Sequence, residues 1–273
     1  MAQSPISMMT TPTSFETILF DIAEGVATIT LNRPDRLNAL TTSISQEMLA
    51  ALKTCARDDM VRCVVITGAG RAFSAGQDLA EFAQVDDDFS VADHLRHGYH
   101  RLVLAMHQLE KPILAAVNGV AAGAGLGLAL AADMRIASDK ASFVTAFIGI
   151  GLAPDSGVSW HLQRLIGPAR AFELLATGRK VGAEEALRLG LVNQVVPAES
   201  LEETVNGLAR QLAQGPTRGI GLTKRTLNKA ADMTLAQALE YEAQIQEIAI
   251  RTRDHREGVL AFLEKRPPKF EGR

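Results

Sequence analysis

The spacing of apolar positions changes along this chain, and each change predicts a different element. Residues 18–22 and 27–31 alternate apolar and polar side chains around Glu24 and Gly25, a pattern typical of two antiparallel strands joined by a tight turn. Residues 61–66 are almost continuously apolar and rich in β-branched side chains, which predicts a strand covered on both faces. We interpret two further segments in the same way, residues 113–117 and 191–196.

Helical periodicity fills the intervals between these strands. It predicts amphipathic helices at residues 43–56, 91–109, 126–132, 158–165 and 169–177. Strands that alternate with helices predict an α/β fold with a largely buried sheet. After Pro197 the pattern predicts helices only, at residues 201–213, 222–231, 235–252 and 255–265. We therefore expect a core over residues 15–197, a C-terminal helical region over residues 198–273 integrated with it, and a loose leader over residues 1–14.

One uncharged segment, residues 112–132, is long enough to be considered as a membrane-spanning helix. It contains Asn118 and several glycines, however, and no cluster of Lys or Arg and no aromatic belt brackets it. A buried strand, a glycine-rich loop and a buried helix fit this composition better. The sequence therefore predicts no contact with a membrane.

Composition narrows the class of protein further. The chain of 273 residues is 47% hydrophobic and has a net charge of -3 with both signs dispersed, so it offers no basic stripe for nucleic acid. Cys55 and Cys63 form no zinc-binding or CxxC spacing, and they suit a reducing compartment. The first 32 residues contain no Lys or Arg, unlike a targeting peptide. We expect a cytoplasmic protein.

Two glycine-rich loops, residues 67–79 and 118–128, follow two of the predicted buried strands. Loops of small residues let a ligand approach the backbone and leave N–H groups that can point at it. Two such loops on neighbouring strands could aim two N–H groups at one oxygen, as in an oxyanion hole. Tight packing and turns are the alternative, and spacing alone leaves both open. Neither loop matches GxGxxG or a P-loop, and the chain lacks a GxSxG nucleophile motif.

Asp155 is the only acidic residue between Asp139 and Glu173. Its neighbours Pro154 and Ser156-Gly157 suit a turn or a helix cap. Its apolar surroundings suit a carboxyl group with a raised pKa that exchanges protons during catalysis. Four of the six histidines fall on the predicted helix 91–109 without partners at metal-ligand spacing, so we predict no metal site.

Taken together, the motifs LNRPDRLNAL, GAGRAFSAGQDL, NGVAAGAGLGLAL and FVTAFIGIGLAPDSG resemble the crotonase superfamily, also called the enoyl-CoA hydratase/isomerase family. The resemblance covers residues 15–270, nearly the whole chain. It implies a spiral of ββα turns with a helical C-terminal region, and a homotrimer or dimer of trimers. It also implies an acyl-coenzyme A thioester as the substrate, so that coenzyme A is part of the substrate and no separate cofactor is needed.

The resemblance assigns roles to individual residues. The backbone N–H groups of Gln77 and Ala124 align with the pair that holds the thioester carbonyl. Six further positions align with coenzyme A or substrate contacts: Arg36, Leu37, Ala75, Asp78, Leu79 and Gly123. The two glutamates of hydrating family members align with Gly127 and Phe147, which cannot transfer protons. Phe82 and Phe147 are our candidates for the wall of the acyl pocket, with core packing as the alternative.

Within the family, Asp155 and the segment REGVLAFLEKRPPKF are similar to members that isomerise ring-epoxidised phenylacetyl-CoA in phenylacetate degradation. Asp155 also aligns with the nucleophile of members that remove chlorine from chlorobenzoyl-CoA. We therefore expect an acyl-CoA isomerase, of phenylacetate or fatty acid metabolism, in which Asp155 transfers a proton. The alternatives are an enoyl-CoA hydratase in the broad family sense, a dehalogenase with Asp155 as nucleophile, and a non-catalytic scaffold in which Asp155 caps a helix.

Overall fold

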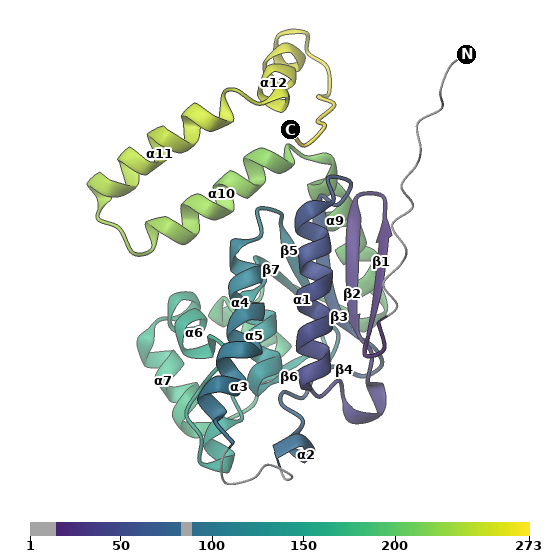
Figure 1. Cartoon of the computed structure of the whole chain (residues 1–273), viewed down its shortest axis with the longest axis vertical. Helices are drawn as coiled ribbons and strands as arrows, with labels where there is room; N and C mark the ends of the chain where they lie inside the picture. Colours follow the sequence, from purple (N-terminus) through teal and green to yellow (C-terminus); the bar gives the residue numbers. More distant parts are fainter. Residues whose placement is uncertain (1–14, 83–88) are drawn as a thin grey trace.

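The computed structural model describes residues 15–82 and 89–273, and its centre is a six-stranded sheet in the order β1-β2-β3-β5-β7-β10 (Figure 1). The strands are β1 (Ile18–Ala23), β2 (Val26–Leu31), β3 (Cys63–Gly68), β5 (Ile113–Val117), β7 (Met134–Ser138) and β10 (Gln194–Val196). β1 and β2 form the predicted antiparallel hairpin around Glu24 and Gly25. Every other pairing in this sheet is parallel.

A second, smaller sheet was not predicted by the hydrophobic pattern. It consists of the short strands β4 (Ala72–Ser74), β6 (Val120–Ala122), β8 (Ser142–Val144) and β9 (Val181–Gly182). β4, β6 and β8 each follow one strand of the large sheet, and a helix comes next along the chain. This repeated ββα order is the expected spiral. Runs of three residues are too short to show a period of two, which is why the sequence did not reveal these strands.

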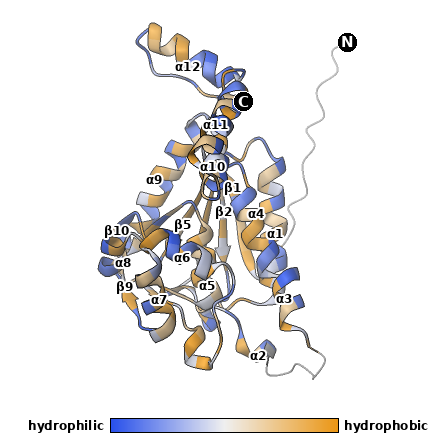
Figure 2. Ribbon diagram, turned by 90° about the vertical axis from the view of Figure 1, so that its left-hand side faces the viewer, coloured by the Kyte–Doolittle hydropathy of each residue, from blue (hydrophilic) through white to orange (hydrophobic). Residues whose placement is uncertain are grey.

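Helices cover both faces of the large sheet. α1 (Thr42–Arg57), α4 (Tyr99–Gln108) and α5 (Gly123–Ala131) belong with one face of the sheet to the larger hydrophobic core. The smaller core lies on the other face, where α9 (Leu201–Gln214) packs over residues such as Val65 and Leu114 (Figures 1 and 2). The predicted burial of β3 and β5 on both faces is therefore confirmed.

The remaining helical elements complete the chain order. They are η1 (Pro34–Arg36), α2 (Leu79–Phe82), α3 (Val91–His97), η2 (Phe147–Ile150), α6 (Val158–Ile166), α7 (Pro168–Thr177), α8 (Ala183–Leu189), η3 (Ala198–Ser200), α10 (Thr217–Ala230), α11 (Leu235–Ala249) and α12 (Arg253–Leu263). The single helix predicted over residues 91–109 is wrong, because the chain breaks at Gly98 between α3 and α4.

The uncharged segment 112–132 folds as β5, β6 and α5, which confirms the predicted buried strand and buried helix. Part of the predicted glycine-rich loop is instead the strand β6, and α5 already begins at Gly123. In the part of the chain that the structure describes, no helix has both the length and the apolar character needed to span a membrane.

Candidate active site

A mainly apolar pocket of about 350 Å³ lies where the loop after β4, the segment 146–155 and the first residues of α2, α4 and α5 meet α3. It brings together seven of the site residues named from the sequence: Ala75, Gln77, Leu79, Gly123, Ala124, Phe147 and Asp155. These residues come from three separate motifs that are far apart along the chain. The fold therefore gathers the glycine-rich loops and the isolated carboxylate at one place.

The loop that carries Gln77 is fixed by the neighbouring segment around Leu40. The N–H of Leu40 donates to the carbonyl of Gly76 at 2.7 Å, and the N–H of Asp78 donates to the carbonyl of Leu40 at 2.8 Å. These bonds are those of an isolated parallel bridge between Leu40 and Gln77, so the Gln77 N–H points away from Leu40. Among the described residues, no acceptor bonds to this N–H. It is available to a ligand in the pocket.

The second N–H group comes from the start of α5. Ala124 is the second residue of that helix, and the first four N–H groups of a helix have no acceptor within it. The positive end of the helix dipole adds to the attraction for an oxyanion. A Cβ on residue 76 would lie only 2.7 Å from the Ala122 carbonyl oxygen and 3.4 Å from the Ala124 nitrogen. Glycine at position 76, with a φ of +90°, thus allows the two candidate N–H groups to lie side by side.

Asp155 lies in the loop before α6 and is half-buried in the same pocket. Burial raises the pKa of its carboxyl above the ordinary value, while a hydrogen bond and the nearby His100 and His94 oppose the rise. That bond comes from the Ser156 hydroxyl, which donates to Asp155 Oδ1 at 2.8 Å. A carboxyl group with a raised pKa in an apolar pocket is suited to accepting and returning a proton.

The alternative in which Asp155 caps a helix is wrong. α6 begins after Gly157, which is its N-cap, and no side chain accepts a hydrogen bond there. Asp155 instead lines the pocket, and its carboxylate accepts a hydrogen bond from Ser156.

The two positions that align with the hydratase glutamates are filled differently in this structure. Phe147 is buried and lines the pocket. Gly127 lies within α5 against the loop after Asp155, so that a Cβ there would stand 2.7 Å from the Ser156 carbonyl oxygen. The Ser156 backbone thus occupies the space that a side chain at position 127 would need.

Replacing Gly127 with glutamate is therefore expected not to produce hydration of crotonyl-CoA. The collision with Ser156, together with burial of a charge in α5, should destabilise the fold by at least about 3 kcal/mol. Urea unfolding and a hydration assay measure both effects. Gly207→Glu on the exposed face of α9, where a Cβ meets no atom within 4 Å, is the matched control. A stable Gly127→Glu variant that hydrates crotonyl-CoA would contradict this account.

Three residues predicted to contact coenzyme A or substrate do not line the pocket: Arg36, Leu37 and Asp78. The Leu37 carbonyl accepts from the N–H of Ala75 at 2.9 Å, which fixes the start of the Gln77 loop. Asp78 forms an ion pair with Arg33 at 2.8 Å, and the hydrogen bond from this arginine lowers the pKa of the carboxyl. Arg36 is exposed. Phe82 ends α2, and its side chain lies outside what the structure describes.

Sequence reasoning missed two polar residues of the pocket, His94 of α3 and Tyr99 of α4. Their rings meet edge to face with centroids 5.9 Å apart. The histidines of this segment led only to the prediction that they hold no metal ion. The available signal was Gly98, because a glycine inside a helical pattern suggests a change of direction. Among the described residues, no group of histidine, cysteine and acidic side chains could hold a metal ion.

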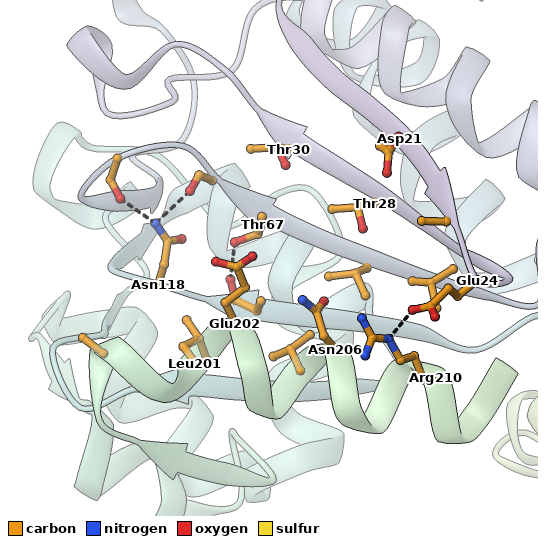
Figure 3. A pocket seen from close by; sticks show the side chains of 18 residues that line it. Asp21, Glu24, Thr28, Thr30, Thr67, Asn118, Leu201, Glu202, Asn206 and Arg210 are labelled. Carbon is orange, nitrogen blue, oxygen red and sulfur yellow. Dashed lines mark hydrogen bonds and ion pairs between the residues drawn. The ribbon is translucent and has the colours of Figure 1, made fainter. Parts of the chain in front are cut away.

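A polar groove of about 580 Å³ lies apart from this pocket, between α9 and one face of the large sheet (Figure 3). Thr28 and Thr30 of β2 face it from the sheet, and Glu202 and Asn206 from α9. Arg210 closes one end through an ion pair with Glu24 at 2.6 Å. The groove contains neither Asp155 nor the Gln77 and Ala124 N–H groups, so we do not place the chemistry there.

Comparison with known proteins agrees with this fold. Residues 21–273 match the family described as Enoyl-CoA hydratase/isomerase, and the chain belongs to this family. The sequence is 46% identical to the 1,2-epoxyphenylacetyl-CoA isomerase of Escherichia coli (strain K12), over 94% of this chain and 99% of that protein. It is 40% identical to 4-chlorobenzoyl coenzyme A dehalogenase-2 of Arthrobacter sp, over 81% of each chain.

A solved structure gives the same result for the fold. The enoyl-CoA hydratase from Bacillus anthracis superposes with a TM-score of 0.88 at 36% identity, covering 94% of this chain and 100% of that chain. The predicted family and the crotonase-like fold are confirmed. The relatives are named for an isomerase, a dehalogenase and a hydratase, so membership of the family leaves the reaction open.

Proposed function

We propose that this protein is an acyl-CoA isomerase that moves a double bond, or opens a ring epoxide, close to a thioester. The observation that carries the proposal is one carboxyl group, that of Asp155, in a pocket that also offers the N–H groups of Gln77 and Ala124. Hydration by the family's two-glutamate route lacks its carboxylates, because positions 127 and 147 are glycine and phenylalanine.

For a 3-enoyl thioester, the reaction needs a single acid-base group. The Asp155 carboxylate removes a proton from the carbon next to the thioester. The electron pair of that C–H bond forms a double bond to the carbonyl carbon, and the π pair of the carbonyl moves onto its oxygen. The N–H groups of Gln77 and Ala124 stabilise this oxyanion, and each such donor contributes roughly a hundredfold to a thousandfold in rate. The carboxyl group then returns the proton at the far end of the conjugated system, and the electrons move back to form the new double bond.

The pocket favours a compact acyl group over a long chain. Its volume of about 350 Å³ is lined by Leu95, Phe147 and Leu152 among other apolar side chains. An aryl-acetyl group with a modified ring matches this size and polarity. The 46% identity to 1,2-epoxyphenylacetyl-CoA isomerase supports the same substrate class, and with it a role in phenylacetate degradation.

Hydrolytic dehalogenation is a second candidate, because His94 lines the same pocket as Asp155. Asp155 would attack the ring carbon and expel the halide, and an imidazole would activate the water that hydrolyses the aryl ester. The spacing of the six histidines along the sequence does not place one beside Asp155. Phe147 and Tyr99 supply aromatic surface, but most of the pocket wall is aliphatic.

The experiment that separates these reactions uses the wild-type protein with four thioesters. A 3-enoyl-CoA reports isomerisation by the rise of conjugated-enoyl absorbance, and crotonyl-CoA reports hydration by its fall. Ring-1,2-epoxyphenylacetyl-CoA and 4-chlorobenzoyl-CoA are followed by chromatography of the products and by chloride release. We expect isomerisation of the first or third substrate with little hydration. Chloride release alone would replace the isomerase proposal with the dehalogenase.

We also propose assembly as a trimer or a dimer of trimers. The support beyond the resemblance is apolar surface on the C-terminal helices, which extend beyond the two sheets in Figure 1. Leu235 of α11 and Phe262 of α12 are 76% and 83% exposed. Surfaces of this kind are commonly covered by a partner subunit. Light scattering of the purified protein would decide the number of subunits. Function without a separate cofactor, and a cytoplasmic location, stay predictions.

A further inference from the structure

Tyr99 lies between two groups that the proposed chemistry uses, yet that chemistry gives it no part. It is the first residue of α4 and is only 3% exposed. Its ring lines the same pocket as Asp155 and Ala124. Its hydroxyl donates a hydrogen bond to Oε1 of Gln77, so α4 is tied directly to the loop that carries the Gln77 N–H.

The other end of the Gln77 side chain is also held. Its Nε2 donates to Oε2 of Glu81 at 3.2 Å and to the carbonyl of Asp78 at 3.3 Å. The Glu81 carboxylate in turn accepts from the N–H of Thr42, the first residue of α1, at 3.3 Å. The carboxamide of Gln77 is therefore anchored to α4 on one side and to α1 on the other.

The Tyr99 hydroxyl is able to serve as a permanent donor. Burial raises the pKa of Tyr99, and the negative charge of Asp155 raises it further, so the hydroxyl stays protonated at neutral pH. This proton is committed to Gln77, while Asp155 receives its hydrogen bond from Ser156. A bond from Tyr99 to Asp155 would instead stabilise the carboxylate and weaken it as a base.

We propose that Tyr99 is a positioning residue for the oxyanion pair: by holding the Gln77 carboxamide, it fixes the direction of the Gln77 N–H. Bonds with Leu40 fix the backbone on one side of Gln77, and Tyr99 fixes its side chain on the other. The inference rests on the proposed function in one respect, that a thioester carbonyl binds between Gln77 and Ala124. An oxyanion donor acts where charge develops, so a turned N–H lowers kcat more than it weakens substrate binding.

The first test removes the hydroxyl and keeps the ring. Tyr99→Phe is expected to lower kcat for isomerisation by about tenfold and to change KM by less than about twofold. The expected decrease in kcat is smaller than that for complete loss of an oxyanion donor, because the Gln77 N–H remains present but is less well directed. Tyr241→Phe in α11 is the matched control, because Tyr241 is the other of the two tyrosines and lies outside the pocket. A wild-type kcat for Tyr99→Phe would overturn the inference.

A double-mutant cycle tests whether Tyr99 acts through Gln77. Gln77→Met retains the backbone N–H and the length of the side chain but removes the acceptor. If the inference is correct, the double variant Tyr99→Phe/Gln77→Met has about the same kcat as either single variant. Effects that multiply in the double variant would show that Tyr99 supports the fold independently of Gln77, and would overturn the inference.

A spectroscopic readout separates this inference from the proposed reaction. Cinnamoyl-CoA absorbs at longer wavelength when hydrogen bonds polarise its carbonyl, whether or not the protein turns it over. We expect a red shift on binding to wild type and to Tyr241→Phe, and a smaller shift with Tyr99→Phe at similar affinity. If the smaller shift with Tyr99→Phe were found but the wild type showed no isomerase activity, the proposed reaction would be wrong and the role of Tyr99 would be supported. An undiminished shift with Tyr99→Phe would overturn the role even if isomerisation is found.

Discussion

Asp155→Asn is expected to lower kcat for isomerisation of a 3-enoyl-CoA by about 10²- to 10⁴-fold, with a small change in KM. Asparagine has the same shape and can still accept the hydrogen bond from Ser156, but it cannot take a proton from carbon. The oxyanion pair is untouched, so substrate binding and the red shift of bound cinnamoyl-CoA should remain. Steady-state kinetics and this spectrum together measure the loss of proton transfer alone.

The pH profile of the wild type adds an independent check. Asp155 acts as a base only when ionised, so the rate should fall as the pH is lowered through its pKa. Burial raises this pKa, while the charges of His94 and His100 hold it down, so we expect the acidic limb above the ordinary carboxyl value of about 4. The residual rate of Asp155→Asn should lack this limb. If the rate instead fell at the ordinary carboxyl pKa, this would contradict burial of the Asp155 carboxyl in the active enzyme.

Stability should distinguish lost chemistry from lost structure. A raised pKa means that the folded state disfavours the charged form of the Asp155 carboxyl. The contribution of Asp155 to the free energy of unfolding therefore falls as the pH rises from its pKa in the unfolded chain to its higher pKa in the folded chain. At neutral pH the neutral asparagine should leave Tm unchanged or slightly higher. Asp21→Asn, in the polar groove beside α9, is the control and should retain full activity (Figure 3). If Asp21→Asn lost activity while Asp155→Asn remained active, the active site would have to be assigned to the groove instead of the pocket.

Gly76→Ala has the second largest expected effect, a loss of about a hundredfold in kcat. Residue 76 has a φ of +90°, and the new Cβ would stand 2.7 Å from the Ala122 carbonyl oxygen. The loop must shift away from α5, which separates the Gln77 N–H from that of Ala124. The red shift of bound cinnamoyl-CoA should decrease in parallel, and both are measured well below the Tm of the variant, which we expect to fall.

The matched control for this change is Gly207→Ala. Gly207 lies on α9, and a Cβ there meets no atom within 4 Å. Alanine should stabilise this helix by about 0.5–1 kcal/mol and leave catalysis unchanged. A folded Gly76→Ala protein with the wild-type rate would show that the two N–H groups do not form the oxyanion hole.

Much of this description could be read from local patterns. The hairpin, the buried strands β3 and β5, and helices such as α1 and α7 follow from periodicity, because a period of two or 3.6 reports which side of an element is buried. The break at Gly98, which separates α3 from α4, was missed although the glycine itself was a signal, because the apolar positions of residues 91–109 fit one continuous helix. The short strands of the second sheet were missed because their pairing is made between residues distant in sequence.

The sequence by itself determined the α/β class, the family, and the isolation of Asp155 among apolar residues, because composition, spacing and motifs are properties of the chain alone. Only the tertiary structure decided that Asp155 lines the pocket instead of capping α6, and that Leu40 leaves the Gln77 N–H unpaired within the described residues. It also brought Tyr99 to Gln77. Hydrogen bonding and burial depend on which distant segments meet, and that is settled only when the whole core packs.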